Sequence, residues 1–167
     1  MTKILVTGAT GLVARQVTHL LAQGGHSVRA LVRNAEKAQD LADAGVELVV
    51  GDLTDAATLK RAGEGVDRVF LLTPFVEHSA ALVEQVVNAL PKDAFVLRMS
   101  AVGADHERPL ALGRDHAAAE QKVKDSGRPW AVIQPNFFSD NLVTFFADSV
   151  RKDGAFYGSA GDGQAAY

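Results

Sequence analysis

Short apolar runs alternate with helical segments along almost the whole chain, and this alternation limits the possible folds more than any other feature. Six runs rich in Val, Ile, Leu and Phe occupy residues 3–7, 26–32, 46–50, 66–72, 94–100 and 130–134. The segments between and after them have the apolar spacing of helices, at residues 12–23, 35–44, 56–62, 77–90, 114–126 and 139–152. Strands that alternate with helices form parallel β-α-β units. The sequence therefore predicts an α/β fold, a doubly wound parallel sheet with helices on both faces.

Turn and cap residues separate these segments. Gly24-Gly25, Gly45, Gly63 and Gly127 follow predicted helices, where a left-handed residue commonly ends the helix. Thr54 and Asp55 precede the third predicted helix as candidate N-caps.

The first predicted strand runs directly into a glycine pattern at the start of the first predicted helix. Gly8, Gly11 and Ala14 are three residues apart, giving G-x-x-G-x-x-A. Glycines at such a turn let the backbone approach a pyrophosphate closely, and the N-terminus of the helix favours the negative charge of that group. The glycines could also be needed only for the geometry of the turn. We expect a dinucleotide to contact this loop and the first helical turn at Gly8, Thr10, Gly11, Leu12 and Val13.

The end of the second predicted strand indicates which dinucleotide binds. NAD sites usually have Asp or Glu here, to bind the ribose 2′-hydroxyl. This chain has Arg33, whose planar guanidinium suits a 2′-phosphate, and Lys37 follows four residues later. Either residue could instead be an ordinary solvated side chain. The sequence favours NADP(H) over NAD(H).

Two further strand ends supply candidate cofactor contacts. Asp52 could accept a hydrogen bond from an adenine amino group, with Leu53 against the ring, or Asp52 could simply cap a helix. Thr73 and Pro74 follow the fourth strand, where they could line the cofactor channel or serve only loop geometry.

Composition excludes several classes of chemistry and partner. The chain has no cysteine, which rules out disulfides and thiolate sites, and no metal site is expected. A net charge of −3 without a basic block argues against direct binding to nucleic acid. No segment approaches the roughly 20 apolar residues of a membrane span. We expect a cytoplasmic protein.

These motifs together resemble the NmrA-like family of atypical short-chain dehydrogenases/reductases. The resemblance rests on "VTGATGLVA", "ALVRN", "GDLTD" and "SGRPWAVIQPNFFSDNL". It implies a Rossmann fold that binds NAD(P)H, with Asn136 and Phe137 toward the nicotinamide. Gln134 stands where the family usually has arginine before proline. We expect one NAD(P)-binding domain over residues 1–167. Family members normally continue beyond the position of Tyr167, so residues 135–167 are expected to begin a substrate-cleft region that lacks its C-terminal portion.

The resemblance also locates a departure in the fifth helix. Extended short-chain reductases carry Tyr-x-x-x-Lys and then a glutamate four residues later. Glu120 matches that glutamate, so Leu112 and His116 occupy the tyrosine and lysine positions. By this analogy His116 lies near the nicotinamide ribose, and Glu120, on the same helix face, could orient the imidazole and favour its charged form. His116 could equally be a partly buried histidine bound only to Glu120.

Two hypotheses about function follow. The first is an NADPH-dependent oxidoreductase that resembles quinone reductases and reduces a small electron-poor acceptor. His116 and Ser100 are its candidate catalytic residues. Ser100 matches a family position near the reacting carbonyl, but it could also be a turn residue. The alternative is a non-catalytic NADP(H)-binding redox sensor that acts through a protein partner. A homodimer is compatible with both.

Overall fold

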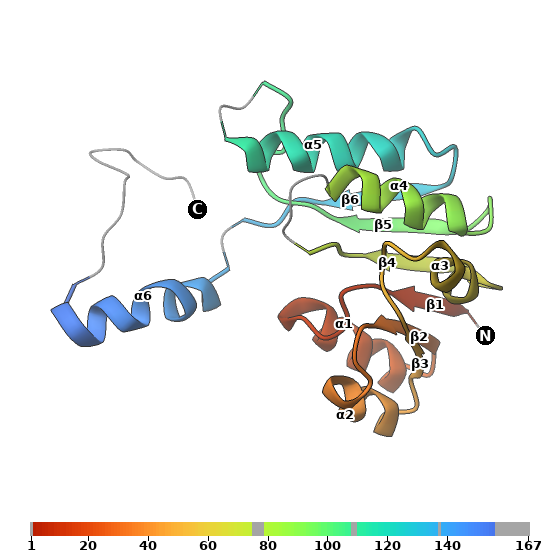
Figure 1. Ribbon diagram of the computed structural model, residues 1–167, viewed down its shortest axis with the longest axis horizontal. Helices are drawn as coiled ribbons and strands as arrows, with labels where there is room; N and C mark the ends of the chain where they lie inside the picture. Colours follow the sequence, from red (N-terminus) through yellow and green to blue (C-terminus); the bar gives the residue numbers. More distant parts are fainter. Residues whose placement is uncertain (1, 75–78, 108–109, 137, 156–167) are drawn as a thin grey trace. The chain divides into compact units, whose positions relative to one another are not determined.

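Six parallel strands form one sheet in the order β3-β2-β1-β4-β5-β6 (Figure 1). Their bounds are Lys3–Val6 (β1), Ser27–Val32 (β2), Glu47–Val50 (β3), Arg68–Leu71 (β4), Phe95–Met99 (β5) and Trp130–Ile133 (β6). The strand order reverses between β1 and β4, which is the doubly wound Rossmann arrangement. The predicted fold class is confirmed.

The computed structural model describes residues 2–74, 79–107, 110–136 and 138–155. The chain divides into two units, residues 1–134 and 135–167. The whole sheet lies in the first unit.

Helices cover the sheet on both faces and enclose two apolar cores. The helices of the first unit are α1 (Leu12–Gln23), α2 (Gln39–Asp43), α3 (Ala56–Gly63), α4 (Ser79–Ala89) and α5 (Ala111–Lys124). Val6 of β1 packs in the core that contains Ala14 of α1 and Leu41 of α2. Leu5 points to the opposite face, into the core formed with α3, α4 and α5. Successive side chains of a strand alternate between the faces, so the sheet is buried from both sides.

The observed elements differ from the predicted ones mainly at helix ends. Residues predicted as one helix at 35–44 form a short 3-10 turn, η1 (Glu36–Ala38), followed by α2. Helix α5 begins at Ala111, three residues before its predicted start.

One of the predicted left-handed caps is wrong. In the predicted pair Gly24-Gly25 the left-handed residue is Gly25, with φ of 78°, while Gly24 has φ of −73°. Gly63 lies inside α3, where a β-carbon would be 2.6 Å from the carbonyl oxygen of Ala89, next to α4. Glycine is needed there because two backbones approach closely. Gly45 and Gly127 are left-handed as predicted, with φ of 82° and 70°.

The second unit contains α6 (Asp140–Asp153), which ends at the left-handed residue Gly154. Val143 and Val150 on this helix are exposed. Among the described residues, no helix has the length and apolar character needed to span a membrane.

Candidate functional site

The ends of β1 and β4 are joined where the strand order reverses. The hydroxyl of Thr7 donates to the carbonyl oxygen of Leu72 at 2.7 Å and accepts from its backbone N–H at 2.9 Å. Thr7 is fully buried. The loops that follow the two strands diverge from this fixed point, and ligands of doubly wound sheets bind in the crevice between such loops.

The glycine loop presents a helix N-terminus without a side-chain cap. Gly8 is left-handed, with φ of 67°, and its carbonyl oxygen accepts from Gly11 N–H at 2.8 Å. Gly11 is the N-cap residue of α1; no side chain caps this end of the helix, and its first turn carries no acidic residue. The first N–H groups of a helix have no partner within the helix and favour an anion. This end of α1 therefore fits a phosphate group.

A groove of about 250 Å³ lies beside this loop, at the carboxyl ends of the first four strands. Seven predicted cofactor residues line it: Gly8, Thr10, Arg33, Asp52, Leu53, Thr73 and Pro74. Five other lining residues were not predicted from the sequence: Leu31, Val32, Gly51, Leu72 and Leu82. Four of these follow from their places at strand ends, whereas Leu82 lies on α4 and reaches the groove only through the packing of that helix.

Asp52 and Arg33 give this groove one charge of each sign. The carboxylate of Asp52 accepts from the backbone N–H of Thr54 at 2.9 Å and from its hydroxyl at 2.8 Å. These bonds, with a smaller contribution from the positive charge of Arg33, hold the pKa of Asp52 below its usual value. Asp52 therefore shapes the turn, while the N-cap of α3 is Asp55, which accepts from Ala57 N–H.

Four other predicted cofactor residues of the first unit, Gly11, Leu12, Val13 and Lys37, are not among those that line the groove. Leu12 is exposed, and Val13 packs against the apolar core beneath α1. Lys37 is exposed, and its carbonyl oxygen accepts from the Arg15 guanidinium at 2.7 Å. Asn136 belongs to the second unit, and Phe137 lies outside the described residues. Their cofactor contacts stay predictions.

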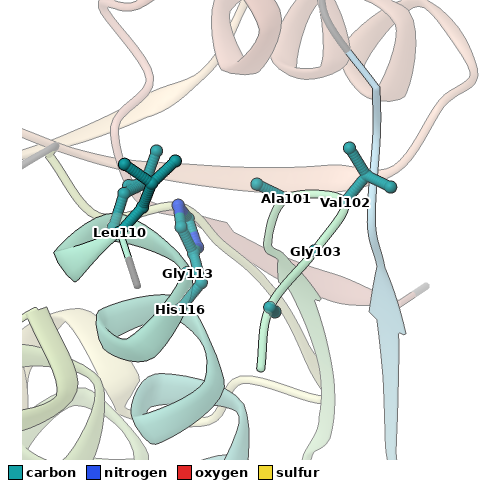
Figure 2. Close-up of a pocket in the computed structure, with 8 residues that line it drawn as sticks. Ala101, Val102, Gly103, Leu110, Gly113 and His116 are labelled. Atoms are coloured by element: carbon teal, nitrogen blue, oxygen red, sulfur yellow. The ribbon is translucent and has the colours of Figure 1, made fainter. Parts of the chain in front are cut away.

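A second pocket, of about 260 Å³, lies between the end of β5 and the start of α5. Figure 2 shows the His116 imidazole beside Leu110, with the loop of Ala101, Val102 and Gly103 opposite. Ala104, Leu112 and Gly113 complete the described lining, so His116 is the one lining residue with a polar side chain.

Ser100 and Glu120 lie behind His116. The Ser100 hydroxyl is buried, 3.3 Å from Nδ1 of His116. Glu120 is also buried, and it accepts a hydrogen bond from the Gln134 amide at 2.7 Å, while Ser100 also favours the ionised carboxylate. Its other oxygen is 3.4 Å from Nζ of Lys124. Burial raises the pKa of Glu120, but these hydrogen bonds outweigh it and leave the pKa below its usual value.

Glu120 favours the charged form of His116, as expected, but it does not decide the direction of the pKa shift. Burial lowers the pKa of His116, and the nearby positive charge of Arg98 lowers it further; Glu120 and Asp115 oppose this but are outweighed. Arg98 lies on β5, fully buried, with its own pKa lowered by burial to about 10. This lowered pKa favours the neutral form of the imidazole.

The sequence analysis did not identify Arg98. Its position within an otherwise apolar strand could have indicated a buried charge, and a buried charge needs a nearby partner. In the described part of the chain, no group of three or more His, Cys, Asp or Glu side chains could hold a metal ion.

A family model for the NmrA-like family matches residues 1–160. The chain belongs to the NmrA-like family. A relative from Xenophilus azovorans, NAD(P)H azoreductase, is 38% identical over 98% of this chain and 58% of its own length. Quinone oxidoreductase 2 of Escherichia coli strain K12 is 32% identical over 98% of this chain and 58% of its own length.

Two solved structures of reductases are similar to this chain in fold. The NADPH-dependent quinone oxidoreductase of Escherichia coli, solved with NADPH, matches with a TM-score of 0.79 and 29% identity over 94% of this chain and 56% of that one. Triphenylmethane reductase of a Citrobacter species, solved with NADP(H), matches with a TM-score of 0.78 and 29% identity over 95% of this chain and 58% of that one. This NmrA-like chain thus spans little more than half the length of the relatives it matches.

Proposed function

We propose that this chain binds NADP(H) in the groove beside the glycine loop and is the cofactor-binding part of an NADPH-dependent reductase of small electron-poor acceptors such as quinones. The observation that carries the proposal is the groove itself, which Arg33 lines together with Gly8 and Thr10 of the loop that leads into the uncapped N-terminus of α1. Relatives named for NAD(P)H-dependent reduction support it.

The chain's own residues fit the successive parts of the cofactor. Backbone N–H groups at Gly11 and the first turn of α1 would hold the pyrophosphate, and Arg33 the 2′-phosphate. Leu53 and Asp52 would meet the adenine, and Thr73 would line the path along the sheet edge. When bound, the cofactor supplies the hydride, and the protein orients it and excludes water.

The second pocket is our candidate for the acceptor site. It lies at the carboxyl end of β5, and because the strands are parallel this is the same sheet edge as the groove. The chain has leucine at position 112, where extended short-chain reductases have the tyrosine acid. A quinone that takes up hydride becomes a stabilised phenolate that can await a proton from water, whereas a reduced aliphatic ketone needs an acid at once. Quinones therefore suit this site better than simple ketones.

NADPH consumption with a panel of quinones and aliphatic ketones tests the proposal. We expect turnover with quinones and much slower turnover with ketones, and ketone reduction at the quinone rate would refute the mechanism. Gly11→Val is the control, because a branched side chain at the N-cap should block the pyrophosphate and abolish turnover. Tight NADPH binding without reduction of any acceptor would instead favour the redox-sensor hypothesis.

A further inference from the structure

One guanidinium joins the helix that begins at the glycine loop to the segment that follows Arg33. Arg15 lies near the start of α1, where its backbone N–H donates to the carbonyl oxygen of Gly11 at 2.9 Å. Its Nη2 donates to the carbonyl oxygen of Lys37 in η1 at 2.7 Å, and its Nη1 donates to the carboxylate of Asp40 in α2. The planar fork of one side chain therefore holds two nearby points of the chain beside α1.

Asp40 fixes the orientation of this guanidinium. Its other carboxylate oxygen is 2.9 Å from Nε2 of His19, which lies one turn after Arg15 on α1. Hydrogen bonds from His19 and Arg15 hold the pKa of Asp40 below its usual value, so the carboxylate is ionised at neutral pH and can only accept. Both oxygens of Asp40 are thus bonded to side chains of α1, and bonds that involve a charged group are the stronger ones.

The segment held in this way carries the candidate contacts for the 2′-phosphate. Residues 33–37 are all exposed, and the basic side chains among them are Arg33 and Lys37. Asn34 closes a turn within the segment by accepting from the backbone N–H of Glu36 at 2.8 Å. NADP(H) carries its pyrophosphate and its 2′-phosphate on one molecule, so the groups that bind them must be held at a fixed separation. The bonds of Arg15 link the helix that would bind the first to the segment that would bind the second.

We propose that Asp40, acting through Arg15, is a positioning residue that holds Arg33 and Lys37 in place for the 2′-phosphate and thereby sets the preference of the site for NADP(H) over NAD(H). The inference rests on the proposed function, because it takes the N-terminus of α1 and Arg33 as the phosphate contacts. A binding group that is already fixed loses less conformational freedom when its ligand binds. The Arg15–Asp40 pair therefore strengthens binding of the cofactor that carries the 2′-phosphate and does little for the cofactor that lacks it.

The charge of Asp40 alone predicts the opposite effect. A carboxylate repels a phosphate, so removing it from α2 should tighten NADPH binding if Asp40 acted only through its charge. If Asp40 acts by positioning, its removal should weaken NADPH binding. The sign of the change therefore distinguishes the two roles.

Calorimetric titration with NADPH and NADH compares Asp40→Ala with Asp43→Ala. Both substitutions remove one negative charge from α2 and leave alanine in the helix, but Asp43 bonds to Gln39 of its own helix, at 2.9 Å. We expect Asp40→Ala to reduce the ratio of NADPH affinity to NADH affinity by roughly two- to tenfold, which corresponds to the cost of ordering one side chain on binding. Asp43→Ala should not reduce it. An unchanged or increased ratio in Asp40→Ala would overturn the inference.

A second variant and a double-mutant cycle test the path from Asp40 to the phosphate contacts. Lysine keeps the positive charge at position 15 but lacks the fork that reaches both partners, so Arg15→Lys should also reduce the ratio. In the Arg33→Ala background, Asp40→Ala should have a clearly smaller effect on the ratio, because one of the groups that it positions has been removed. An equal effect with and without Arg33 would refute positioning of that residue. Arg15→Lys decides the matter if Asp40→Ala does not fold, since an unchanged ratio in Arg15→Lys would also overturn the inference.

Failure of the proposed function would be seen separately. If the unmodified chain bound neither NADPH nor NADH, the proposed function would be refuted before any variant is compared. If it bound NADPH with a preference that survives both Asp40→Ala and Arg15→Lys, the proposed function would stand and only the positioning role would be refuted.

Discussion

Gly8 and Gly11 lie three residues apart in one loop but have different backbone requirements. Gly8 has φ of 67°, whereas Gly11 has φ of −82°, which any residue can adopt. A β-carbon would lie 3.2 Å from a carbonyl oxygen at either position, that of Leu72 for Gly8 and that of Gly8 for Gly11. The two differ in φ, because a left-handed conformation costs an L-residue about 1–2 kcal/mol. Gly8→Ala should therefore lower the free energy of unfolding in urea by at least about 1 kcal/mol, and Gly11→Ala by clearly less. Equal losses would contradict this account of the loop.

Arg33 is exposed and lines the groove beside Asp52. A hydrogen bond to a charged group contributes about 1.5–3 kcal/mol, so Arg33→Ala should reduce the preference for NADPH over NADH by roughly ten- to a hundredfold. Calorimetric titration of both cofactors measures the ratio. Lys92→Ala, at an exposed lysine before β5, should leave it unchanged. Equal affinities for the two cofactors in the unmodified chain would show that Arg33 does not select the 2′-phosphate.

The sequence predicted the position of a residue correctly where the order of strands and helices alone determines that position. The glycine loop, Arg33 and Asp52 follow strand ends, so their positions around one groove could be inferred from the order of elements. The direction of the His116 pKa shift could not be inferred in this way. It depends first on the burial of the ring and then on the charge of Arg98, which is 18 positions away in the sequence. Helical spacing identified Glu120 as a neighbour but not the burial that outweighs its charge.

The contact between α3 and α4 depends on a glycine within a helix. A β-carbon at Gly63 would lie 2.6 Å from the carbonyl oxygen of Ala89, so one helix must shift to accommodate it. We expect Gly63→Ala to destabilise the fold by about 1–3 kcal/mol in urea denaturation, although alanine is the better helix former. Gly45→Ala is a useful comparison, because it meets no atom within 4 Å and incurs only the cost of its φ of 82°. Stabilisation by Gly63→Ala would show that the helices separate easily.

The strands and most helices could be predicted because the spacing of apolar residues indicates which face of an element is buried. The ends of the helices were harder to predict from the sequence. The N-cap of α5 is Leu110, which makes no side-chain cap hydrogen bond, so no Ser, Thr, Asp or Asn marks the start of the helix in the sequence. Gly63 was misassigned for a related reason. A glycine after a helical run indicates a cap, and only the position of Ala89 shows that close approach is the actual requirement.

The burial of His116 couples the stability of the whole molecule to pH. Because its pKa in the folded chain is below the usual value of 6.5, the unfolded chain binds a proton that the folded chain does not, between those two pKa values. The free energy of unfolding should therefore fall as the pH is lowered through 6.5, and this contribution should level off below the folded pKa. Urea denaturation of the wild type and His116→Gln between about pH 8 and about pH 5 isolates this contribution.

The variant should lose part of the pH dependence, whereas His26→Gln, at an exposed histidine after α1, should retain it. Parallel curves for the wild type and His116→Gln would mean that the ring is equally easy to protonate in both states of the chain. A wild-type curve that rises toward acid would reverse the sign of the effect and place a charged imidazole in the folded protein.

The reversed strand order also has a consequence for synthesis on the ribosome. In the described part of the chain, neighbouring strands in the sheet are consecutive in the sequence except for β1 and β4, where Ile4 aligns with Arg68. Half of the sheet can assemble from β1, β2 and β3 while one edge of β1 still lacks its neighbour, and such an edge can pair with other nascent chains. Translation speed over the segment that leads to β4 therefore sets how long that edge is open to misassembly.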